Sequence, residues 1–139
     1  MDEEVAVLTL SPAVLLALLG GPLAILALGF VASEVVARRA FSEALGRLAA
    51  RYGLSFRAGR GLRGGATASG RIDDLEIAIG LYLGLLGRMP TTFTFARASA
   101  GGGRGYFMAT DPGVHTSEAD LERLLAEARK GAAERLARS

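Results

Sequence analysis

The sequence contains no cysteine, and it has a single histidine, His115. The lack of cysteine excludes disulfide bonds, thiol catalysis and cysteine-ligated metal sites. No acidic pair lies at ligand spacing near His115, so we interpret it as a turn residue beside a helix cap, not as a metal ligand or catalytic base. Ser69 and the other hydroxyl side chains have no identifiable base. The sequence therefore predicts a protein that is not an enzyme and holds no cofactor and no metal.

Charge is missing from residues 5–33, which are 29 consecutive positions of a 139-residue chain. All 16 basic and 14 acidic residues lie outside this segment, and soluble domains of this size rarely contain such a stretch. A bilayer core of about 30 Å requires about 20 helical residues. Ser11 is a suitable N-cap, and Pro12 suits the first helical position because its missing N–H has no partner there. The pattern predicts a transmembrane helix over residues 12–37.

The sequence Gly20-Gly21-Pro22 interrupts this predicted helix midway. Pro22 lacks a backbone donor and crowds the carbonyl group of Leu18, so we expect a kink at residues 20–22. Two alternatives stay open, namely a re-entrant hairpin that bends at these residues and a buried helical hairpin of a soluble oligomer. A cleaved signal peptide is disfavoured, because the start of the chain is acidic and the apolar run is long.

The charges on either side of the apolar segment predict its orientation. Asp2, Glu3 and Glu4 precede it, whereas Arg38 and Arg39 follow it. Cytoplasmic flanks of membrane helices are enriched in basic residues, so residues 1–11 are expected to form a short acidic extracytoplasmic tail and residues 38–139 a cytoplasmic domain. Fifteen of the 16 basic residues are arginine, which with many Ala and Gly residues is typical of GC-rich bacterial genomes. The expected location is the bacterial cytoplasmic (inner) membrane.

Small side chains recur at every fourth position along one face of the predicted membrane helix, in a row that is broken only by Ile25. The proposed helix–helix contact consists of Ala13, Ala17, Gly21, Gly29 and Ser33. Small residues allow two helices to approach closely in lipid, where no hydrophobic force drives their association. The partner would be another transmembrane protein or a second copy of the chain. The alternative is chance, because Ala and Gly are frequent throughout this sequence.

The periodicity of the remaining chain predicts an α+β domain. Apolar residues at helical spacing continue to Tyr52, Gly53 is expected to end this helix as a left-handed cap, and a last helix is expected to begin after Thr116 or Ser117. Between them, alternating patterns predict strands over residues 54–58, 66–72, 75–83, 92–98 and 106–110, with an apolar connection at residues 85–90. The predicted fold is an N-terminal transmembrane helix followed by a small antiparallel sheet of four to five strands flanked by two helices.

Two further patterns resemble functional motifs. Gly59-x-Gly61-x-x-Gly64 has the spacing of a dinucleotide-binding loop, but a strand is predicted after it, where such a loop requires a helix. Asp73, Asp74 and Glu76 form an acidic cluster without a second set of convergent groups. We interpret this cluster as a solvated hairpin tip.

Arginines gather near the predicted membrane surface. Arg38, Arg39, Arg57, Arg60 and Arg63 are candidates for contact with anionic lipid, since each near-surface arginine adds about 1 kcal/mol of attraction. The alternative is ordinary surface charge. Nucleic acid is not an expected partner, because aromatic residues do not interleave with the arginines and the net charge is only +2.

These observations favour a non-enzymatic single-pass membrane protein that acts as an accessory subunit or scaffold. Its helix would contact another helix in the bilayer, and its cytoplasmic domain would dock a protein. The alternative is a membrane-anchored lipid- or ligand-sensing module that uses the arginine-rich loop.

Overall fold

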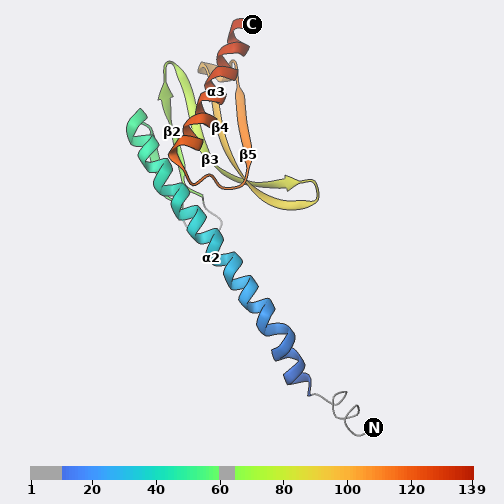
Figure 1. Ribbon diagram of the computed structural model, residues 1–139. Coiled ribbons are helices and arrows are strands. Elements are labelled where there is room, and N and C mark those ends of the chain that lie inside the picture. Colours follow the sequence, from blue (N-terminus) through green and yellow to red (C-terminus); the bar gives the residue numbers. More distant parts are fainter. Residues whose placement is uncertain (1–10, 60–64) are drawn as a thin grey trace. The chain divides into compact units, whose positions relative to one another are not determined.

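The computed structural model describes residues 11–59 and 65–139, and the chain divides into two compact units, Met1–Val36 and Ala37–Ser139. The acidic tail and Arg60, Gly61, Arg63 and Gly64 lie outside the described residues. In chain order the elements are α2 (Pro12–Tyr52), β1 (Ser55–Arg57), β2 (Thr67–Ile72), β3 (Leu75–Leu86), β4 (Met89–Ser99), the 3₁₀ turn η1 (Gly101–Gly103), β5 (Phe107–Pro112) and α3 (Glu118–Arg138) (Figure 1). The predicted α+β class, with an apolar N-terminal helix, an antiparallel sheet and a C-terminal helix, is confirmed.

The first unit contains the N-terminal part of α2. Ser11 caps the helix as predicted, because its Oγ accepts a hydrogen bond from the backbone N–H of Val14 at 3.3 Å. The helix continues through Pro22 without a break, so a hairpin that bends at residues 20–22 is not formed. The kink stays a prediction. By length and composition α2 is able to cross a membrane, and its most apolar window has a mean hydropathy of 2.5 with none of its residues buried.

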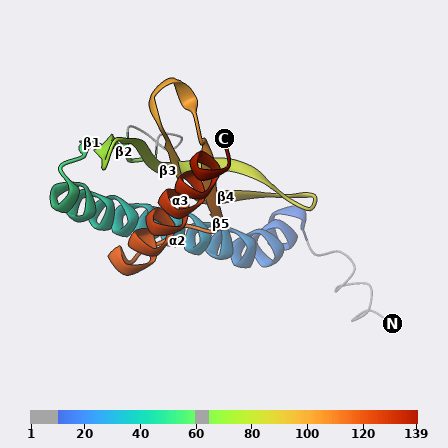
Figure 2. The same ribbon diagram turned by 90° about the horizontal axis from the view of Figure 1, so that it is seen from above.

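The second unit contains the last turns of α2, the five-stranded sheet and α3. The strands are antiparallel and lie in the order β1-β2-β3-β4-β5, so each strand pairs with its neighbour in sequence. Such a meander needs only short connections. Both helical segments of this unit pack on one face of the sheet, and Figure 2 shows α3 lying along that face.

The hydrophobic core fills the space between that face and the helices. Its largest fully buried apolar side chains are Phe41, Leu45, Leu48, Ile79, Leu121, Leu124 and Leu125. The strands contribute Ile77, Ile79, Ala96 and Ala98, which point to the same face because strand side chains alternate. One apolar stripe of α3 is buried from Leu121 to Ala132, and Ser117 caps this helix by accepting a hydrogen bond from the Asp120 N–H at 3.1 Å.

The hairpins agree with the predicted turn at Asp73-Asp74 but differ from the sequence prediction at the next turn. Asp73 and Asp74 have φ angles of 49° and 65°, as a two-residue type I′ turn requires. Residues 85–90, predicted as a connection, instead belong to β3 and β4 except for the turn Gly87-Arg88. The prediction was wrong because a two-residue turn leaves the flanking Leu and Met residues free to pair as strands, with Leu86 opposite Met89.

An ion-pair network joins the end of α2 to the start of α3. Nη1 of Arg51 donates to Oε1 of Glu118 at 2.8 Å, and its Nη2 donates to Oε1 of Glu122 at 3.2 Å. The hydroxyl of Tyr52 donates to the same oxygen of Glu122 at 3.0 Å. These two donors, Tyr52 first, lower the pKa of Glu122 below its ordinary value. The network aligns the two helices on the sheet, although exposed pairs of this kind contribute little stability.

Thr94 is the one fully buried polar side chain among the described residues. Its Oγ1 donates to the carbonyl of Gly113 at 2.8 Å and accepts from the backbone N–H of His115 at 3.1 Å. A single hydroxyl of β4 therefore satisfies two backbone groups of the connection between β5 and α3.

We expect Thr94→Val to lower the free energy of unfolding by about 1–3 kcal/mol, because the isosteric side chain leaves the N–H of His115 and the carbonyl of Gly113 without partners. The measurement is denaturant unfolding followed by circular dichroism in detergent micelles. The control is Thr110→Val at an exposed position of β5, where we expect the free energy of unfolding to change by no more than about 0.5 kcal/mol. Equal stability of both variants would contradict the assigned role of Thr94.

Candidate functional site

The sheet face turned away from the helices is a candidate binding surface of the second unit. Its residues follow from the strand register, in which every second residue of each strand points to this face. We call it the outer face, and we define it by the residues of β2 to β5 that share it: Thr67, Ser69, Arg71, Glu76, Ala78, Gly80, Tyr82, Gly84, Phe93, Phe95, Arg97, Ser99, Met108 and Thr110. Sheets with one uncovered face are usually polar there, whereas this face mixes aromatic and polar residues.

Three aromatic rings lie at the centre of the outer face. The rings of Tyr82 and Phe93 are stacked with centroids 5.2 Å apart, and the ring of Phe95 is tilted against Tyr82 at 5.9 Å. Glycines make room for them, since a Cβ atom at Gly84 would lie 2.9 Å from the Phe93 ring and one at Gly80 would lie 3.1 Å from the Phe95 ring. Only 9% of Phe93 is exposed, so the rings form a small apolar cluster separate from the main core.

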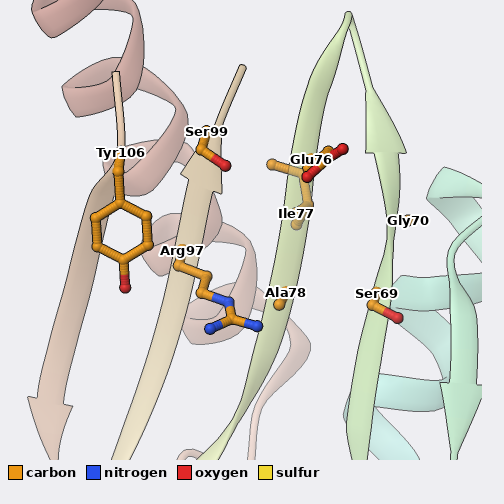
Figure 3. Close-up of a pocket in the computed structure, with 8 residues that line it drawn as sticks. All are labelled: Ser69, Gly70, Glu76, Ile77, Ala78, Arg97, Ser99 and Tyr106. Carbon is orange, nitrogen blue, oxygen red and sulfur yellow. The ribbon is translucent and has the colours of Figure 1, made fainter. Parts of the chain in front are cut away.

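A shallow polar depression of about 450 Å³ lies beside this cluster (Figure 3). It is lined by Ser69, Gly70, Glu76, Ile77, Ala78, Arg97, Ser99 and Tyr106. In Figure 3, the side chains of Arg97 and Tyr106 stand on neighbouring strands, and α3 lies behind the sheet. The depression therefore opens on the outer face.

The depression offers one carboxylate, one guanidinium and three hydroxyl groups. Glu76 and Arg97 provide charges of opposite sign, and Ser69, Ser99 and Tyr106 provide hydrogen-bond donors and acceptors. No histidine, second carboxylate or lysine lines it. This arrangement is able to bind a polar group through hydrogen bonds and charge. Within residues 11–59 and 65–139, no three His, Asp or Glu residues gather in a way that could hold a metal ion.

His115 lies in a cluster that sequence reasoning did not predict. Its Nε2 lies 2.9 Å from Oδ2 of Asp111, and Nη2 of Arg123 donates to the same oxygen at 3.1 Å. Because the backbone of His115 is also held by Thr94, the cluster fixes the connection between β5 and α3. The expected position of His115 in a turn before the helix cap agrees with the structure.

The structure distributes the other predicted residues over separate elements. Ala13, Ala17, Gly21, Gly29 and Ser33 all lie on α2 in the first unit, and a Cβ atom added at Gly21 or Gly29 would meet no described atom within 4 Å. Their contact with another helix stays a prediction. Of the arginines proposed for lipid contact, Arg38 and Arg39 lie on α2 and Arg57 ends β1.

The acidic cluster is divided by the hairpin. Oδ2 of Asp73 accepts a hydrogen bond from Nη2 of Arg129 on α3, whereas Glu76 lines the depression on the outer face. The glycine motif extends over residues outside the described ranges, and the next described element is the strand β2, which begins at Thr67. The acidic residues therefore serve the hairpin and the outer face separately and do not form one site.

Comparison of the chain with protein-family models, with curated proteins and with solved structures gives no match. Functional inference for this chain thus rests on its own surfaces. The two that distinguish it are the exposed apolar part of α2 and the outer face of the sheet.

We expect Phe93→Ala to lower the free energy of unfolding by about 3 kcal/mol, because the loss of this nearly buried ring leaves a cavity and removes the stacking partner of Tyr82. Met108→Ala, at an exposed position of the same face, should change it by no more than about 0.5 kcal/mol. Thermal and denaturant unfolding in micelles measure both values. A Phe93 variant as stable as the Met108 variant would show that the aromatic cluster is not a second small core.

Proposed function

We propose that this chain is a non-enzymatic, single-pass protein of the bacterial inner membrane that acts as an accessory subunit or scaffold. The second unit lies in the cytoplasm, and its outer face docks a protein partner. The observation that carries the proposal is the contrast between the two faces of the sheet. One face is covered by helices and buries the core, whereas the other leaves Tyr82 exposed against the buried ring of Phe93 and leaves Met108 exposed on β5.

The composition of the outer face supports a protein as its partner. Tyrosine, phenylalanine, methionine and arginine are the residues enriched at the centres of protein–protein interfaces. Here Tyr82 and Phe95 lie on the inner strands β3 and β4, with Arg97 and Glu76 farther along these strands, and Met108 lies opposite Arg97 on the edge strand β5. The aromatic side chains are already fixed by packing, so docking would cost little side-chain entropy.

The exposed apolar surface of α2 supports the membrane anchor. Its large apolar side chains, such as Leu16, Ile25 and Phe30, are about 70% exposed, which is favourable in lipid and costly in water. The arginines that follow this segment favour a cytoplasmic second unit. The row of small residues on α2 would then contact another transmembrane protein or a second copy.

A ligand-sensing module is the second candidate function, and the depression favours it. Its volume falls within the range of small-molecule sites, and its lining contains both charges needed to orient a zwitterion. The loop arginines proposed for this role, Arg60 and Arg63, lie outside the described residues. The protein-docking function is preferred because the depression is shallow and continuous with the exposed aromatic surface.

The docking proposal predicts that Met108→Glu removes a partner. The new carboxylate would lie opposite Arg97 and would lose its hydration where a partner covers it, a cost that the ion pair offsets only in part, so the amount of bound partner should fall about tenfold. The measurement is quantitative mass spectrometry of proteins that co-purify with the full chain from detergent-solubilised native membranes.

Lys130→Glu is the matched control, because it changes an exposed charge on α3, away from the outer face. The partner should be retained in this variant. If the wild type and both variants recovered the same proteins in equal amounts, docking on the outer face would be wrong.

The anchor proposal predicts that Gly21→Ile and Gly29→Ile weaken assembly in the membrane. Each new side chain has space within the chain itself, so it should obstruct only a second helix and reduce the crosslinked fraction to less than about half. Crosslinking of the full chain in native membranes measures this fraction, with Leu23→Ile on the opposite side of α2 as the control. Unchanged crosslinking of both glycine variants would refute the contact.

A further inference from the structure

The outer ends of β3 and β4 extend beyond the rest of the sheet as a two-stranded ribbon. The last pair between β2 and β3 is Ala68 with Ile79, and the last pair between β4 and β5 is Phe93 with Pro112. Residues 83–92 therefore pair only with each other among the strands that the structure describes. Figure 1 shows this ribbon, in yellow, projecting from the sheet. We call residues 83–90 the ribbon tip.

The ribbon tip is apolar on both of its faces. Leu83 and Leu85 continue the face of Ile79, whereas Leu86 and Met89 continue the outer face. Their exposed fractions are 73%, 69%, 55% and 72%. A sheet that packs on one partner surface needs an apolar pattern on one face only. The ribbon tip therefore suits a medium that surrounds it rather than a surface that covers one side.

The chain itself points to lipid as that medium. The second unit begins at Ala37, directly after the apolar segment of α2 that is long enough to cross a bilayer. If that segment spans the membrane, the second unit is covalently held at the bilayer surface. A bilayer is then the apolar phase available to both faces of the ribbon tip.

We infer that the ribbon tip inserts into the boundary between lipid headgroups and acyl chains. This inference rests on the proposed membrane anchor. The three residue steps from Leu83 to Leu86 span about 10 Å of strand, which matches the depth of about 5–10 Å typical of interfacial insertion. The turn is tight, because Gly87 has a φ of 64° and permits a two-residue connection.

The single charge of the ribbon tip is compatible with this shallow position. Arg88 is exposed at the turn, and its long side chain is able to reach back to the phosphate groups while its methylene groups stay among the acyl chains. Anionic headgroups would attract it. The ribbon tip thus combines apolar side chains with one cation, as interfacial membrane-binding segments do.

The test uses the full chain, which is naturally free of cysteine. Single variants Leu85→Cys and Met89→Cys, one on each face of the ribbon tip, are labelled with an environment-sensitive fluorophore. They are reconstituted in vesicles of phosphatidylcholine and phosphatidylglycerol. Ile25→Cys on α2 reports the anchor, and Lys130→Cys on α3 is the water-exposed control. All four positions are exposed, so labelling leaves the core intact.

The proposal predicts blue-shifted emission at both ribbon positions and quenching by lipid-attached nitroxide about threefold stronger than at Lys130→Cys. If Ile25→Cys is quenched but the ribbon positions match the control, the insertion is wrong and the anchor stands. If Ile25→Cys is not quenched either, both proposals are wrong. A blue shift without quenching by lipid would mean that protein, such as a second copy, covers the ribbon tip. Quenching on one face alone would mean that lipid does not surround the ribbon tip. Either result overturns the inference.

Discussion

The proposed anchor depends on one constraint, which is that water solvates a run of 29 consecutive uncharged residues poorly. Among the described residues of this run, the large apolar side chains of α2 are exposed, and the core lies within residues 41–132. Exposing several such side chains to water costs about 1.5–3 kcal/mol each. Lipid removes this cost, since a helix satisfies its own backbone hydrogen bonds there.

The burial of apolar side chains away from water also determines how the second unit is built. Its sheet has one face buried under helices, where Ile77, Ile79 and Ala96 meet Leu121 and Leu125. Its polar contacts stabilise this packing: Thr94 holds the connection before α3, and Arg51 links the helix ends. The outer face has no such cover in the described structure and carries aromatic and apolar residues.

Much of the fold could be predicted from the sequence, because local chemistry determined it. Ser11 was identified as a helix cap, Ser117 was one of two candidates with Thr116, and the alternation around Asp73-Asp74 indicated the hairpin. The true extent of β3 and β4 was missed, since Leu85, Leu86 and Met89 are apolar on both faces and show no alternation. The aromatic cluster was missed because Tyr82 and Phe93 become neighbours only through the register. An alternation of Phe93 and Phe95 in a predicted strand was the available signal. The contact of His115 with Asp111 likewise depends on how β5 leads into α3.

The central claim, that lipid surrounds the first unit, is tested most directly by alkaline carbonate extraction of native membranes that contain the full-length chain. Carbonate at high pH removes peripheral proteins but leaves proteins with spanning helices in the membrane pellet. The account predicts that the chain stays in the pellet and is released only by detergent. Recovery in the carbonate supernatant, or in the aqueous fraction before extraction, would contradict it.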